Sequence, residues 1–324
     1  MPPIDASGLI PTTYSNQIIQ GVVQQSAALA LGRRVPMGSG IAEIPIAGAF
    51  PVASFISVGA RKPFTDFMLT SQTMRAEEVA AVISIPQAYL DDASVDLWGF
   101  ARPQLAQAIA VAVDNAIIWG VGAPASYPAG GIVAPAFSTI VPAGSDALDT
   151  VNDAMAAVEA QGVPVTGSAA DLVVKSALRG VRDAGGALLL GPAQVDNAAM
   201  SSIYGVPVVF TLTAPDQTKD FITGDWDALL IGVRSDIGYD LSTDGIIADS
   251  AGKVLVSAFQ DDQVLMRVHA RFGCVIAQPV TPRAPTGAKP FAVTDVAPAG
   301  GTTLSASEDS APAPASGATK KASS

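Results

Sequence analysis

Seventeen consecutive residues without a charged side chain, from Ile44 to Ala60, restrict the fold of this chain more than any other segment. Two prolines and two glycines interrupt the run. A helix that crosses a membrane needs about 20 unbroken apolar residues, so the run is not a membrane span. Its β-branched and aromatic residues favour an extended segment instead, and Arg61 and Lys62 follow it directly.

The composition indicates a globular protein that packs mainly small side chains. Hydrophobic residues make up 49% of the 324 residues, enough for a sizeable core, but aromatic residues only 6%. The formal net charge of −11 disfavours direct binding of nucleic acid, because neutralising phosphates requires a basic surface. Cys274 is the only cysteine, which excludes an internal disulfide and a cysteine-based metal cluster.

The charges are distributed unevenly along the chain. Residues 1–75 carry five basic and three acidic side chains, whereas residues 76–283 carry ten basic and twenty-three acidic ones. A mildly basic N-terminal part beside an acidic body favours association with another copy of the same chain.

Periodicity predicts a mixture of helices and strands. We expect helices at residues 16–31, 97–120, 145–162 and 176–186, and strands at 171–174, 205–212 and 228–233. Two extended segments, 42–58 and 75–90, enclose a long hairpin-like excursion, and two long strands are expected within 253–279. Because the elements do not alternate strictly, the fold class is α+β rather than a doubly wound sheet.

Two of the predicted helices have a clear apolar face. In the helix at 97–120, Pro103 should produce a kink or mark the true first turn, and the apolar face comprises Leu105, Ile109, Val113, Ala116 and Ile117. The helix at 145–162 should begin at a Ser145 cap and stop at Gly162, with an apolar face of Leu148, Val151, Met155 and Val158. After Pro282 the sequence is rich in Ala, Pro, Gly, Ser and Thr, so we expect residues 284–324 to be disordered.

Catalytic and cofactor-binding motifs are missing from the sequence. The glycine-rich stretch GVGAPASYPAGG is not followed by the Lys-Ser/Thr pair of a phosphate-binding loop. His269 is the only histidine, and carboxylate pairs such as Asp91/Asp92 are more typical of caps and turns than of active sites. We therefore expect no enzyme activity, cofactor or metal; a hydrolase that uses His269 with a Ser and an Asp remains the alternative from another class.

The order of several motifs is similar to that of a known family. These motifs are ISIPQAYLDDASVDLWGFARPQLAQAIAVAVDNAIIWGVG, a loop ending AGGIV, GALLLGPAQ, IYGVPVVFT, ITGDWDALLIGVRSDIGYDLS and FQDDQVLMRVHARFGCVIAQP. Over residues 1–283 the chain resembles the major capsid proteins of tailed bacteriophages, with the Hong-Kong-97-type fold that they share with encapsulin shells.

The resemblance implies a division of the chain into named parts. They are an N-terminal arm and first strand (1–45), an extended loop (46–78), a peripheral domain with a long spine helix (79–122), an axial domain (123–252), the long strands of the peripheral domain (253–283) and a C-terminal extension (284–324). It also implies a virion protein that assembles in the bacterial host cytoplasm into hexamers and pentamers of an icosahedral shell. Such a shell encloses double-stranded DNA without binding it specifically.

The resemblance extends to partners. We expect contacts with copies of the same chain, with a portal and with a separate scaffold protein if any. The C-terminal extension either runs along the outer surface, binds a decoration protein or is an inert linker. Some relatives crosslink a loop Lys to an Asn of a neighbour; Lys62 is suitably placed, but no Asn follows Asn197, so crosslinking is not expected. An encapsulin-type compartment that packages a cargo enzyme is the alternative within this fold.

The uncharged run then becomes the candidate inter-subunit contact. We expect Phe50, Phe55 and Phe64 to pack on a neighbouring subunit. Arg61 and Lys62 are expected to meet acidic groups of that neighbour, with the candidates being Asp91, Asp92 and Asp96.

Overall fold

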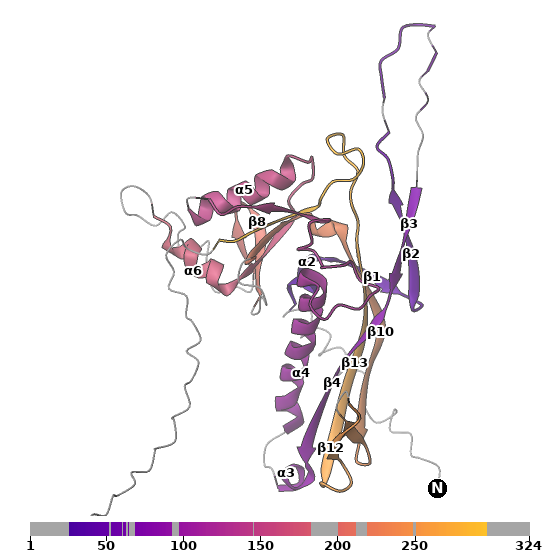
Figure 1. Cartoon of the computed structure of the whole chain (residues 1–324), viewed down its shortest axis with the longest axis vertical. Coiled ribbons are helices and arrows are strands. Elements are labelled where there is room, and N and C mark those ends of the chain that lie inside the picture. Colours follow the sequence, from indigo (N-terminus) through magenta and orange to yellow (C-terminus); the bar gives the residue numbers. More distant parts are fainter. Residues whose placement is uncertain are drawn as a thin grey trace, which may run out of the picture.

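The computed structural model places the described elements around two large sheets, with two smaller sheets of two strands each (Figure 1). It describes residues 26–51, 53–59, 61–62, 64, 69–92, 97–144, 146–182, 200–211, 219–248 and 251–296. The mixed helix and sheet content confirms the α+β prediction. Among these residues, no helix combines the length and apolarity that crossing a membrane requires.

A long four-stranded sheet has the strand order β1-β10-β13-β4. Its members are β1 (Arg33–Met37), β10 (Leu229–Ser242), β13 (Gln263–Ile276) and β4 (Glu77–Pro86). β10 and β13 are antiparallel from the pair Leu229↔Ile276 to the pair Ser242↔Leu265, β4 is antiparallel to β13, and β1 is parallel to β10. Figure 1 shows the α4 helix (Leu97–Asp114) running alongside this sheet, with the short α3 helix (Gln87–Asp92) at the lower end.

The α4 helix confirms the predicted spine helix and its apolar face. It continues through a π-helical turn, η2 (Asn115–Trp119), and ends at Gly120. All five residues of the predicted face are buried: Leu105, Ile109, Val113, Ala116 and Ile117. Pro103 lies inside the helix, six residues after its start, so the alternative that it marks the first turn is wrong. Burial of the apolar face outweighs the one hydrogen bond that a proline cannot donate.

The glycine-rich stretch after α4 folds back onto the end of the helix. The backbone N–H groups of Ile132 and Val133 donate to the carbonyls of Ile117 and Ile118, both at 3.0 Å. Gly131 has a φ of +64°, and a Cβ there would lie 2.6 Å from the Ile118 carbonyl oxygen. The glycines therefore allow a close backbone approach that closes the helix end, which accounts for them without a bound phosphate.

A six-stranded sheet has the order β5-β14-β9-β6-β8-β7. Its strands are β5 (Ser138–Val141), β14 (Phe291–Thr294), β9 (Phe221–Gly224), β6 (Gly167–Asp171), β8 (Val206–Thr211) and β7 (Met200–Ile203). The α5 helix (Ala147–Glu159) packs against this sheet and buries Val151, Met155 and Val158, as its periodicity predicts. Asp146 occupies its N-cap position, while the predicted cap Ser145 lies outside the described residues.

The predicted strand at 171–174 is wrong, because a helix starts there. β6 ends at Asp171, and α6 (Leu172–Gly180) follows, earlier than the predicted 176–186 helix. The Asp171 carboxylate accepts a hydrogen bond from the Val173 N–H at 3.0 Å. This N-cap satisfies one of the unpaired donors of the first turn, and so outweighs the β preference of the valines.

Of the two long strands predicted within 253–279, one is present and the other is not. Only β13 is long; β12 (Val254–Ser257) is short and pairs with β11 (Ile246–Ala248) rather than with β13. The long antiparallel partner of β13 is β10, whose residues fall in the range 123–252 that the resemblance assigns to the axial domain.

The chain after Pro282 also differs from the prediction, since residues 284–296 belong to the fold. All four residues of β14 are buried between β5 and β9. The Phe291 ring packs edge-on against Trp226 with ring centroids 5.4 Å apart. Asp220 accepts a hydrogen bond from the Val296 N–H at 2.6 Å, and burial raises the pKa of this carboxyl to about 6. The sequence does not reveal β14, because a strand of four residues is too short to change the average composition of the segment after Pro282. Residues 297–324 lie outside the described part.

The main core joins the two sheets at the α2 helix (Ala27–Leu31), the only described part of the predicted 16–31 helix. Ala27, Ala28 and Leu29 are fully buried and belong to the same cluster as the inner face of α4. α2 also contacts β6 and β8 of the six-stranded sheet. The α2 helix therefore lies at the junction between the two large sheets.

Candidate functional site

A two-stranded ribbon carries the predicted extended loop away from the rest of the subunit. β2 (Ile41–Ala47) and β3 (Leu69–Arg75) pair antiparallel, from Ile41↔Arg75 to Ala47↔Leu69. Figure 1 shows the described parts of the connecting loop extending beyond the upper end of the ribbon. The hairpin-like excursion predicted from the uncharged run is therefore present.

The loop exposes the aromatic side chains that the sequence singled out. Phe55 and its neighbour Val58 are fully exposed, Phe64 is 87% exposed, and Phe50 is 39% exposed. Arg61 and Lys62 are exposed as well. An apolar surface of this kind on a projecting segment is characteristic of a contact that another molecule completes.

The predicted acidic partners lie far from the loop within one subunit. Asp91 and Asp92 are the last residues of α3, at the end of the long sheet opposite to the loop (Figure 1). Asp96 lies outside the described residues, and the side chains of Asp91 and Asp92 are not described either. A contact between the loop cations and this region can therefore form only between different subunits.

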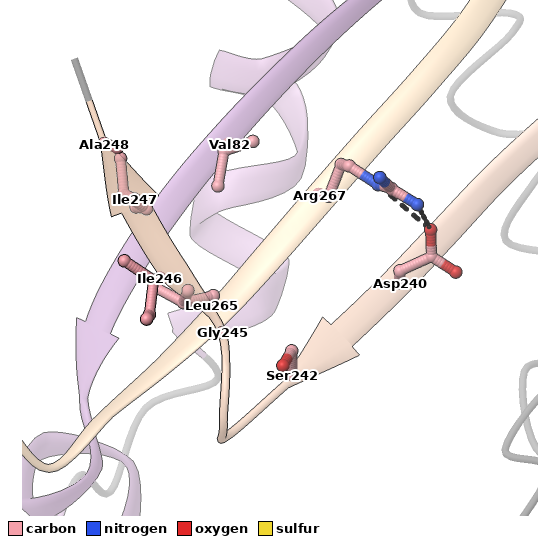
Figure 2. A pocket seen from close by; sticks show the side chains of 9 residues that line it. All are labelled: Val82, Asp240, Ser242, Gly245, Ile246, Ile247, Ala248, Leu265 and Arg267. Carbon is pink, nitrogen blue, oxygen red and sulfur yellow. Dashed lines mark hydrogen bonds and ion pairs between the residues drawn. The ribbon is translucent and has the colours of Figure 1, made fainter. Parts of the chain in front are cut away.

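The sequence did not single out a groove beside the long sheet. Its volume is about 510 Å³, and it lies between the faces of β4, β10 and β13 and the strand β11. Figure 2 shows Val82, Ile246 and Leu265 forming its apolar side, with Asp240 and Arg267 at the other. Ser242, Gly245, Ile247 and Ala248 complete the lining. Because these residues come from four strands, only the register of the sheet brings them together.

Exposed ion pairs connect neighbouring strands of the long sheet. Arg267 donates from Nε to Asp240 Oδ2 at 3.1 Å, and Arg271 lies 3.4 Å from Glu78. The side chains of both pairs are exposed to solvent, which screens the attraction between their charges. They determine how charges are arranged on the surface of the sheet and contribute little to its stability.

The candidate catalytic residues do not form a catalytic arrangement. His269 Nδ1 lies 3.9 Å from Asp240 Oδ2 and has no hydrogen-bond partner among the described residues. Asp240 is instead engaged by Arg267. Cys274 is buried, which raises the pKa of its thiol to about 12. In the described ranges, no three His, Cys, Asp or Glu side chains are close enough together to hold a metal ion.

The geometry defines a class of protein: a subunit with two large sheets and a projecting arm that exposes apolar side chains, as in a component of a larger assembly. The chain belongs to the phage capsid family, since the model of that family matches residues 6–281. It has the Hong-Kong-97-type fold, and it is a structural component of a bacteriophage capsid.

Individual relatives agree with the family match. The chain is 25% identical over 264 residues to the "Probable major capsid protein gp17" of Mycobacterium phage D29, covering 78% of this chain and 80% of that protein. A solved chain from Microbacterium phage Oxtober96 is similar with a TM-score of 0.68 and 26% identity, covering 83% of this chain and 90% of that one. A chain from Mycobacterium phage Cain matches with a TM-score of 0.70 at 24% identity, covering 91% and 97%.

Proposed function

We propose that this capsid protein assembles with copies of itself into hexamers and pentamers, which close an icosahedral shell around double-stranded DNA. The observation that carries this proposal is the projecting loop with Phe55, Val58 and Phe64 in solvent. Apolar side chains gain free energy when another surface removes them from water. A neighbouring copy of the chain supplies that surface in a closed shell.

The energetics of the ribbon support the same proposal. A two-stranded sheet is marginally stable in water on its own, and the strand β2 leaves alternate residues exposed. Burying one large apolar side chain contributes about 1.5–3 kcal/mol. Three such side chains per subunit, repeated around a shell, are sufficient to favour assembly over free subunits.

Charge complementarity determines which part of the neighbouring subunit the loop contacts in this proposal. We infer that Arg61 and Lys62 reach the Asp91, Asp92 and Asp96 region of an adjacent subunit. An exposed pair contributes about 0–1 kcal/mol, but many copies act together in a shell. The expected signature is a dependence of assembly on ionic strength.

Charge reversal of the loop pair tests this contact. We expect Arg61→Glu combined with Lys62→Glu to weaken assembly and to reduce its salt sensitivity, measured by light scattering against ionic strength. Arg33→Glu with Arg34→Glu, an equal charge change at another exposed pair of basic residues, is the matched control. Normal assembly of the loop variant with unchanged salt sensitivity would show that these cations do not contribute.

The two large sheets suggest a division of the subunit into the parts that the resemblance implies. We propose that the long sheet with α4 forms the peripheral domain, that the six-stranded sheet including β14 forms the axial domain, and that residues 46–78 form the extended loop. The similarity in fold to phage proteins supports this division. Assembly in the host cytoplasm, with a portal and with separate scaffold or decoration proteins, belongs to the same proposal.

The contents of the shell distinguish a capsid from an encapsulin-type compartment. With a net charge of −11, the chain is suited to enclosing DNA without specific binding. We expect particles from infected cells to contain nuclease-protected double-stranded DNA. Particles that contain a cargo protein and no genomic DNA would favour the compartment instead.

A further inference from the structure

The carboxyl group of Asp114, the last residue of α4, is 3% exposed and is bonded to one short segment of the chain. It accepts hydrogen bonds from the Ser26 hydroxyl at 2.6 Å and from the backbone N–H groups of Ala27 at 2.9 Å and Ala28 at 3.1 Å. All three donors belong to the start of α2. The carboxyl group therefore joins the end of the spine helix to the start of α2.

No cation balances this buried group within the part of the chain that the structure describes. α2, η2 and β8 carry no charged residue, and Asp171, the only one on β6, lies at the end of that strand. Arg33 and Arg34, which follow α2, are exposed. Burial raises the pKa of the Asp114 carboxyl to about 6, while its three hydrogen bonds lower it, and no neighbouring charge contributes.

The geometry accommodates a proton without breaking the contact. The bond between Ser26 Oγ and Asp114 Oδ1 joins two oxygens, so either of them can donate. A proton on Oδ1 can be donated to Ser26, whose hydroxyl also accepts from the Leu29 N–H at 3.1 Å. Oδ2 remains an acceptor for the Ala27 N–H. Protonation thus removes the buried charge and keeps the bonds of Asp114 to Ser26 and Ala27, while the Ala28 N–H keeps a weaker acceptor and the Ser26 hydroxyl proton no longer points to Asp114.

The α2 helix depends on this connection because it is too short to be stable alone. Its five residues cannot form an isolated helix in water, so its position depends on packing and on the Asp114 hydrogen bonds. Residues 1–25 precede it directly. Detaching α2 exposes the Asp114 carboxyl to water.

We infer that Asp114 and Ser26 form a proton-sensitive anchor, which holds the α2 helix to the spine helix more firmly at mildly acidic pH than at neutral pH. The attached carboxyl has a pKa of about 6, whereas a detached, solvated one has the ordinary value of 3.8. Between these values the attached state binds the proton more strongly, so lowering the pH favours it, and raising the pH through 6 removes that advantage. From pH 7.5 to pH 5 the equilibrium shifts about tenfold towards attachment.

Hydrogen exchange of the full-length protein, followed by mass spectrometry, tests the anchor. After correction for the intrinsic pH dependence of exchange, we expect amides of residues 27–31 to be about tenfold more protected at pH 5 than at pH 7.5. Asp114→Asn should abolish this difference. Asp220→Asn, which changes the other buried carboxyl among the described residues, should leave it intact.

The wild-type profile decides the question even if Asp114→Asn does not fold. Ser26→Ala provides a second variant, which should lower protection at both pH values and retain the rise at pH 5, since the carboxyl remains. Equal protection of the wild-type segment at the two pH values, or a rise that persists in Asp114→Asn, would overturn the inference.

Discussion

Replacing Phe55 by Ala separates the stability of the subunit from the stability of its assembly. In the free subunit the Phe55 side chain is fully exposed, so its removal should change the free energy of unfolding by no more than about 0.5 kcal/mol. In a shell, the same side chain is expected to be buried against a neighbour, where it contributes about 1.5–3 kcal/mol. Since 1.4 kcal/mol corresponds to a factor of ten, the subunit concentration needed for assembly should rise about 10- to 100-fold.

The assay combines denaturant unfolding of free subunits with sedimentation of assembled particles over a range of protein concentrations. Phe291→Ala is the matched control, because it makes the same chemical change at a fully buried position. It should impair the free subunit, whereas Phe55→Ala should impair only assembly. If Phe55→Ala assembled at the wild-type concentration, the loop would not be an assembly contact.

Two further changes test the fold that positions the loop. Phe291→Ala should lower the free energy of unfolding by about 3–5 kcal/mol, because it empties the space beside Trp226; an unchanged denaturation midpoint would mean that β14 is dispensable. Gly131→Ala should cost about 1–3 kcal/mol, because its φ of +64° and a Cβ 2.6 Å from the Ile118 carbonyl both strain the turn after α4. Thermal unfolding of Gly131→Ala is compared with that of Gly122→Ala, where an added Cβ meets nothing within 4 Å. The difference between the two variants isolates the steric part of the destabilisation.

The features predicted well from the sequence are those that local pattern determines. The apolar face of α4, from Leu105 to Ile117, follows from helical periodicity alone, and so does the face of α5. The loop was recognisable because a long uncharged run broken by proline and glycine can neither cross a membrane nor form a regular helix.

The features that were missed depend on contacts between distant segments. β14 forms because its apolar residues fit between β5 and β9, which lie far away in the sequence. The start of α6 depends on the Asp171 cap, a single hydrogen bond that a run of β-branched residues conceals. The Asp114–Ser26 contact joins residues 88 positions apart, so no local signal could indicate it.

The acidic partner of the loop could not be predicted for a different reason. Asp91 and Asp92 lie at the opposite end of the subunit from Arg61 and Lys62, so their proposed contact belongs to the assembly rather than to one chain (Figure 1).

Cryo-electron microscopy of the assembled particle at side-chain resolution tests the central claim most directly. The account predicts that the extended loop lies across a neighbouring subunit, with Phe55 and Phe64 covered and with Arg61 or Lys62 beside a carboxylate of that neighbour. A particle in which the loop projects into solvent, with both phenylalanines uncovered, would contradict it.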